Sequence, residues 1–177
     1  MTSTLTAQIP SRTSSATLDF EALYRAARDD VYGYVATLLR DRSAAEDVTA
    51  AAFERAYRKQ RTYRASRGSE RAWLFGIARN AALDELRRRK RAAALTADPA
   101  DVDAAPPEDV AEAALLRAAV RVALGRLGAR ERELIALKFH AGLDNSEIAA
   151  VLGVSVSNAG TQLHRAMTKL REAVEHA

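Results

Sequence analysis

The sequence contains no cysteine, which excludes disulfides, thiolate chemistry and cysteine-ligated metal sites. Its longest apolar runs are far below the length that spans a membrane, and its N-terminal segment lacks the apolar core of a signal peptide. A cytoplasmic protein is therefore expected. The three histidines are far apart, and neither a phosphate-binding glycine loop nor a spaced carboxylate pair occurs. We expect no catalytic residue, no metal site and no cofactor.

Glycine and proline are scarce, with 8 and 4 residues in a chain of 177. Alanine, arginine and leucine are abundant and β-branched runs are few, which favours helix over sheet. Three of the four prolines lie in one Ala- and Asp-rich strip without aromatic residues, which we expect to be a flexible acidic linker. The predicted fold is all-α: two small helical bundles joined by this linker, the second bundle a helix-turn-helix domain. The expected boundaries are a disordered tail (1–16), a first module (17–92), the linker (93–112) and a second module (113–177).

Positive charge is unevenly distributed along the chain. Residues 17–91 carry a net charge of +6, residues 92–112 carry −6, and residues 113–177 carry +3. Two basic blocks joined by an acidic strip suggest two modules that act on a polyanion. Charge that only solvates helix surfaces would give the same layout, so this pattern alone does not decide between the two interpretations.

The basic charge is strongest between residues 55 and 91, which hold 13 bases and 3 acids interleaved with Tyr57, Tyr63 and Trp73. Bases that neutralise phosphates and aromatic faces that stack on unpaired bases are typical of proteins that bind single-stranded nucleic acid. The alternative is that Trp73 and Tyr57 are core residues. We favour that alternative for Trp73, which begins an apolar stripe, and expect Tyr63 to be exposed in a loop.

Three amphipathic helices are expected in the first module. The first begins near Asp19, and the second carries Ser43 and Glu46 at the spacing of a capping box. The third is capped by Ser69 and follows a basic loop with Gly68 at its turn. Its inner face is predicted at four positions of helical spacing: Trp73, Ile77, Asn80 and Asp84.

The second module begins near Leu115 with two apolar-striped stretches, in which Val122 and Phe139 are among the expected core positions. The segment "NSEIAAVLGVSVSNAGTQLHRAMTKLRE" follows, and its small residues have the spacing of a helix-turn-helix. Four polar residues fall on one outer stripe of the second helix: Asn158, Thr161, Gln162 and Arg165. This stripe favours DNA reading over a plain helical hairpin. Gly160 either permits close approach to the DNA backbone or is a tolerated defect.

Three segments together resemble the extracytoplasmic-function (ECF) sigma factors of the sigma-70 family. "AEDVTAAAFERAYRK" is similar to region 2.2, "RAWLFGIARNAALDELRRRKR" to regions 2.3 and 2.4, and "LGARERELIALKFHAGLDNSEIAAVLGVSVSNAGTQLHRAMTKLRE" to region 4. The likeness covers about residues 19–91 and 113–173. It implies a protein that binds core RNA polymerase, recognises two promoter elements in promoter DNA and helps to melt it, without catalysis of its own. It also implies an anti-sigma factor as a partner.

The resemblance assigns three groups of residues. The polymerase-binding residues are Glu46 and Asp47. The residues implied for the downstream element and for melting are Arg61, Tyr63, Arg64, Arg67, Arg79, Asn80, Arg87 and Arg88. The residues implied for the upstream element are Ser157, Asn158, Thr161, Gln162 and Arg165.

Structural roles compete with some of these assignments, and the chain departs from the family pattern. A capping role would by itself explain Glu46. Likewise, a hydrogen bond to Asp84, one turn away, would by itself explain Asn80. Many relatives have Gln at the position of Ala50, and basic residues at those of Gly160 and Gln162. A stand-alone helix-turn-helix transcriptional regulator is the rival interpretation, but it leaves the basic aromatic first module unexplained.

Overall fold

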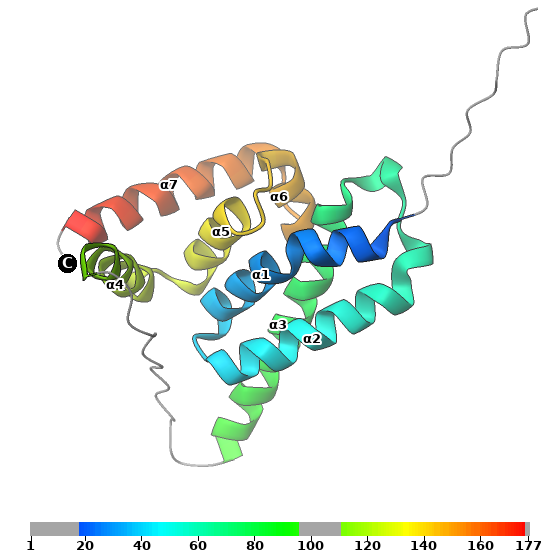
Figure 1. The fold of residues 1–177 in the computed structure, drawn as a ribbon. Coiled ribbons are helices and arrows are strands. Elements are labelled where there is room, and N and C mark those ends of the chain that lie inside the picture. Colours follow the sequence, from blue (N-terminus) through cyan, green and yellow to red (C-terminus); the bar gives the residue numbers. More distant parts are fainter. Residues whose placement is uncertain (1–17, 96–110, 176–177) are drawn as a thin grey trace, which may run out of the picture.

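The computed structural model describes residues 18–95 and 111–175, and within these ranges every regular element is helical (Figure 1). The first module contains α1 (Phe20–Leu39), α2 (Arg42–Lys59) and α3 (Glu70–Leu95), with two short 3₁₀ turns, η1 (Gln60–Thr62) and η2 (Ala65–Arg67), before α3. The second contains α4 (Ala111–Arg126), α5 (Ala129–Phe139), α6 (Asn145–Leu152) and α7 (Val156–Glu175). The all-α prediction is confirmed.

The helix starts of the first module are determined by local side-chain caps. The Asp19 carboxylate accepts from the backbone N–H of Ala22 at 3.0 Å, close to the predicted helix start. The Ser69 hydroxyl accepts from the N–H of Ala72 at 3.1 Å, as predicted. The prediction for α2 was wrong. Its cap is Asp41, which accepts from the N–H of Ala44 at 3.1 Å, so the helix begins before Ser43.

The inner face of α3 lies more than a third of a turn from the predicted one. The buried positions are Ala72, Leu74, Phe75, Ala78, Ala81 and Ala82, whereas Trp73 and Ile77 are half-buried, and Asn80 and Asp84 are exposed. The stripe was misplaced because α3 is covered on two sides, by α1 and α2 and also by α6. Val122 and Phe139 are 51% and 62% exposed, so both are wrong as core positions.

The two modules share one continuous hydrophobic core. In Figure 1, α5 and α6 lie against the first module, where α5 contacts α1 and α6 contacts α3. The cluster joins Tyr34 and Phe75 of the first module to Leu137, Leu143 and Ile148 of the second, all fully buried. The modules are therefore packed together and not merely tethered.

The segment between α3 and α4 is shorter than the predicted linker. α3 continues through Leu95 and α4 starts at Ala111, so both helices extend into the range 93–112. Residues 96–110 and the predicted tail (1–16) lie outside the described residues. Among the helices of the described ranges, none combines the length and apolarity that a membrane crossing requires.

Candidate nucleic-acid interface

α6 and α7 form the helix-turn-helix expected from the sequence. Asp144 caps α6 in a capping box with Glu147, and Gly153 ends it in the left-handed conformation at φ 68°. The Ser155 hydroxyl accepts from the N–H of Asn158 at 3.2 Å at the start of α7. The buried Ala159 lets the two helices approach closely.

The polar stripe on α7 is largely open to solvent. Four of its members are exposed: Ser157, Asn158, Thr161 and Arg165. The fifth, Gln162, is half-buried, and its amide donates to the side-chain oxygen of Asn158 at 2.7 Å. The amide oxygen of Gln162 in turn accepts from Arg130 of α5 at 3.3 Å. The stripe therefore extends onto α5 through Arg130.

Gly160 lies toward the start of α6. A Cβ at this position would lie 3.4 Å from the side-chain nitrogen of Asn145. This is an ordinary van der Waals distance to the end of one flexible side chain, so packing against α6 does not require glycine at this position.

The basic loop between α2 and α3 is held by its own side chains. The Tyr63 hydroxyl donates to the carbonyl oxygen of Gly68 at 3.2 Å, and its ring meets Trp73 edge-on at 5.7 Å between centroids. Arg64 donates to the carbonyl oxygens of Arg61 and Tyr63 at 2.8 and 2.9 Å. Tyr63 is half-buried, so the prediction that it is exposed was wrong, because Trp73 covers one edge of its ring.

A pocket lies between this loop and α3, and we call it the loop pocket. Of the residues implied for the downstream element it brings together four: Tyr63, Arg64, Arg67 and Asn80. Trp73 forms part of the wall, and Ala150 and Val151 of α6 line it from the second module. Arg61, Arg79, Arg87 and Arg88 are not among its lining residues.

The three other predicted arginines of α3, Arg79, Arg87 and Arg88, are held by carboxylates. Arg79 donates to Glu133 of α5 at 2.6 Å, and its side chain is only 20% exposed. Arg87 pairs with Asp84 at 3.2 Å, and Arg88 donates through two nitrogens to Glu85, both at 2.8 Å. Asn80 was considered as a partner of Asp84, but Asp84 instead accepts from Arg87 and, at 3.3 Å, from Arg55 of α2.

The predicted polymerase-binding residues lie on the outer surface of α2. Glu46, Asp47 and the nearby Ala50 are all exposed. Since Asp41 caps the helix, capping does not account for Glu46. This surface is acidic and available to another protein.

Two residues that link the modules, Glu133 and Arg71, were missed from the sequence. Glu133 is 6% exposed and accepts from both Arg79 and, at 2.9 Å, Arg130. Arg71 donates to Asp30 and to backbone carbonyl oxygens of α5's C-terminal turn. No local pattern identifies them, because the partners that they contact in the other elements lie more than 40 residues away in the sequence. Their contacts across the module boundary form only when the modules pack together.

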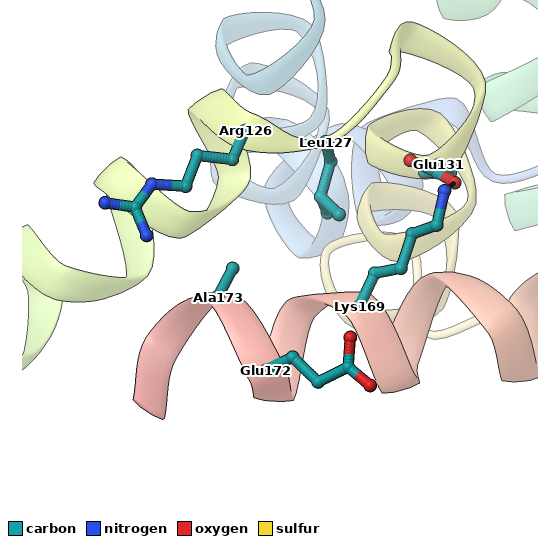
Figure 2. Close-up of a pocket in the computed structure, with 6 residues that line it drawn as sticks. All are labelled: Arg126, Leu127, Glu131, Lys169, Glu172 and Ala173. Carbon is teal, nitrogen blue, oxygen red and sulfur yellow. Dashed lines mark hydrogen bonds and ion pairs between the residues drawn. The ribbon is translucent and has the colours of Figure 1, made fainter. Parts of the chain in front are cut away.

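A second, shallow pocket lies between α4, α5 and α7 (Figure 2). Figure 2 shows Lys169 of α7 reaching toward Glu131 of α5, with which it forms an ion pair. Arg126 and Glu172 also line this pocket, so basic and acidic side chains alternate around it. Such a lining favours neither an anionic nor a cationic ligand. Within the described ranges, no cluster of His, Asp or Glu could hold a metal ion.

Two family models match the chain, Sigma-70 region 2 over residues 23–92 and Sigma-70, region 4 over residues 117–170. The first match contains the loop pocket's main walls and the second contains the helix-turn-helix, so the chain belongs to the sigma-70 family. It is 31% identical over 166 residues to the ECF RNA polymerase sigma factor SigL of Mycobacterium tuberculosis, across 90% of this chain and 93% of SigL. Within the family it is an ECF sigma factor.

Two solved structures share the fold. The sigma factor RpoE, solved in complex with the anti-sigma factor NepR from Bartonella quintana, superimposes with a TM-score of 0.75 at 22% identity, covering 89% of this chain and 97% of RpoE. CnrH, solved in complex with the cytosolic domain of CnrY, gives a TM-score of 0.63 at 26% identity, covering 89% of this chain and 88% of CnrH.

Proposed function

We propose that this sigma factor recruits core RNA polymerase to promoters whose downstream element is captured in the loop pocket and whose upstream element is read by α7. The observation that carries the proposal is the composition of the loop pocket. Tyr63 and Trp73 offer aromatic surface, and the exposed Asn80 amide can hydrogen-bond a base edge. Arg64 and Arg67 are exposed beside it, where phosphates of an unpaired strand would pass.

The upstream element is assigned to the stripe on α7, with duplex DNA as its ligand. The N-terminal turns of a recognition helix meet base edges in the major groove, and Ser157, Asn158 and Thr161 are exposed there. The Gln162 amide can pair bidentately with adenine, and Arg165 lies one turn further on for a phosphate or a guanine.

Other partners follow from the family and from the surface of α2. Glu46 and Asp47 form the surface that docks on core polymerase, and the chain contributes binding and no catalytic group. It acts in the cytoplasm, where polymerase and DNA are. An inhibitory protein partner is also proposed, since the relative CnrH was solved bound to a domain of another protein.

The test is initiation by reconstituted holoenzyme. Core polymerase with the purified chain is used to select bound fragments from a random DNA library, and the selected fragments are then transcribed in vitro. We expect run-off products that start at one position and depend on the chain. Duplex binding by the chain alone, without initiation by the holoenzyme, would support the stand-alone regulator and refute the proposal.

A further inference from the structure

The first residue of α7 is an apolar side chain that the protein leaves uncovered. Val156 is 53% exposed, whereas the next apolar residues along the helix, Ala159 and Leu163, are 1% and 8% exposed. A valine side chain has no oxygen with which to cap a helix, and Val156 belongs to neither hydrophobic cluster that the described residues form. Neither capping nor core packing therefore accounts for valine at this position.

Gly160 lies one helical turn after Val156, on the same side of α7. A side chain at position 160 would tilt back toward the start of the helix, and hence toward Val156. Apart from the nearby backbone of α7 and the chain neighbours of Gly160, the described residues place only Nδ2 of Asn145 within 4 Å of such a Cβ, at 3.4 Å. The space beside Val156 is therefore open, and we call these two positions the Val156–Gly160 patch.

The Val156–Gly160 patch lies at the end of α7 that is suited to approach DNA. Ser157 and Asn158, which follow Val156 in the chain, are exposed members of the polar stripe. The first turn of α7 contains no acidic residue, so no side-chain charge there offsets the positive end of the helix dipole. The N-terminal residues of a recognition helix meet base edges in the major groove. Val156 is therefore expected to meet a base edge beside Ser157.

An apolar side chain can recognise one feature of the major groove. Base pairs present hydrogen-bond donors and acceptors there, and the 5-methyl group of thymine is the apolar group among them. A donor or acceptor placed against Val156 would lose water without gaining a hydrogen-bond partner, which is unfavourable. The methyl group of thymine is therefore the ligand that fits the chemistry of the patch.

We infer that Val156 reads the 5-methyl group of a thymine in the upstream element, and that glycine at position 160 leaves room for this methyl group. The contact makes the sigma factor prefer thymine at one position of the element. The inference rests on the proposed reading of the upstream element by α7. It gives Gly160 a role that packing against α6 does not supply.

The test removes the methyl group from the DNA and the apolar patch from the protein. The probe is the promoter fragment that the reconstituted holoenzyme selects, in which each thymine of the upstream element, on either strand, is replaced in turn by uracil. Uracil lacks only the 5-methyl group and keeps the base pair. Affinity is measured by competition between the modified and unmodified fragments for holoenzyme that contains the full chain.

With the wild-type chain, uracil at one position should lower the affinity about fourfold, as expected when one methyl group loses an apolar contact. Val156→Ala removes the apolar partner, and Gly160→Ala places a methyl group where that of thymine would lie. Both variants should therefore bind the thymine and uracil fragments nearly equally. Alanine has a higher helix propensity than valine or glycine, so α7 is retained in both variants, which circular dichroism verifies.

Val122→Ala is the matched control. Val122 is 51% exposed, much like Val156, but it lies on α4, outside the helix-turn-helix. This variant should keep the preference for thymine over uracil at the same position.

The inference is overturned if the wild-type holoenzyme tolerates uracil at every position, or if the thymine preference survives Val156→Ala or Gly160→Ala. It is also overturned if Val122→Ala abolishes the preference, since the effect would then not depend on the patch. A holoenzyme that initiates normally but tolerates uracil throughout the element refutes this inference alone. One that selects no promoter refutes the proposed function as well.

Discussion

Replacing Arg71 by methionine should uncouple the two modules. The substitution keeps the aliphatic stem but removes two hydrogen bonds to carbonyl oxygens and an ion pair with the half-exposed Asp30. Hydrogen bonds from a charged donor contribute about 1.5–3 kcal/mol each, and a half-exposed ion pair contributes about 0–1 kcal/mol. Because the freed carbonyl oxygens of His140 and Ala141 regain water when the modules part, we expect a net loss of about 2–4 kcal/mol.

Two probes of urea unfolding can detect this uncoupling. Trp73 is the only tryptophan and reports on the first module, whereas circular dichroism at 222 nm reports on all helices. The shared core predicts coincident transitions in the wild type. With a denaturant slope of about 1–3 kcal/mol per M, Arg71→Met should lower the dichroism midpoint by about 1 M or more and separate it from the fluorescence midpoint.

The control is Arg28→Met on the outer surface of α1. The Arg28 side chain is 63% exposed, and in the described part of the chain it pairs with its neighbour Asp29 at 3.3 Å. Replacing it should therefore leave both unfolding midpoints nearly unchanged. If Arg71→Met behaves like Arg28→Met, with coincident transitions at the wild-type midpoint, the contacts of Arg71 do not hold the modules together.

Three further predictions concern the DNA surfaces and acid stability. Tyr63→Ala with Arg64→Ala should lower permanganate reactivity of promoter thymines while core-polymerase binding persists; full reactivity would contradict the role of the loop pocket. Gln162→Ala should relax preference at one base position of the upstream element, whereas Arg165→Ala should weaken binding to all sequences and reduce the salt dependence by about one unit of slope; salt titrations on promoter duplex distinguish the two. Two neighbouring arginines lower the pKa of Glu85 from 4.5 to about 2, so its stabilising effect is complete above pH 4.5 and lost as the pH falls toward 2. Glu85→Gln should weaken the dependence of the unfolding free energy on pH in that window. If the pH profile is unaltered, Glu85 is not a source of the acid sensitivity.

The parts of the fold that could be predicted are those determined within one or two helical turns. Ser69 was identified as a cap, and the start of the first helix was placed near Asp19, because a cap needs only a short polar side chain and an N–H three residues on. Gly68 was identified as a turn residue because its positive φ is local as well. The helix-turn-helix and its exposed stripe follow from the same short-range rules.

The contacts between the modules could not be predicted because they depend on long-range packing. Arg79 was expected on a DNA-reading surface, and nothing near it in sequence indicates that Glu133, 54 residues away, holds its guanidinium. The inner face of α3 was misplaced for the same reason, since α6 covers a side of the helix that an isolated three-helix bundle would leave open. Phe139 looked like a core residue from its apolarity alone, yet it is exposed at the end of α5.

If Asn80 and Arg87 contact the promoter as proposed, α3 fixes the spacing between these two contacts. At about 1.5 Å of rise per residue, the seven residues from Asn80 in the loop pocket to Arg87 correspond to about 10 Å. Duplex DNA advances about 3.4 Å per base pair, so a phosphate held by Arg87 on the adjoining duplex would lie about three base-pair steps from the loop pocket. That interval is set by a rigid helix and not by the loop. Deleting one residue between these positions would turn Arg87 by about 100° and shorten the interval, so it would disturb recognition far more than any single side-chain replacement on α3.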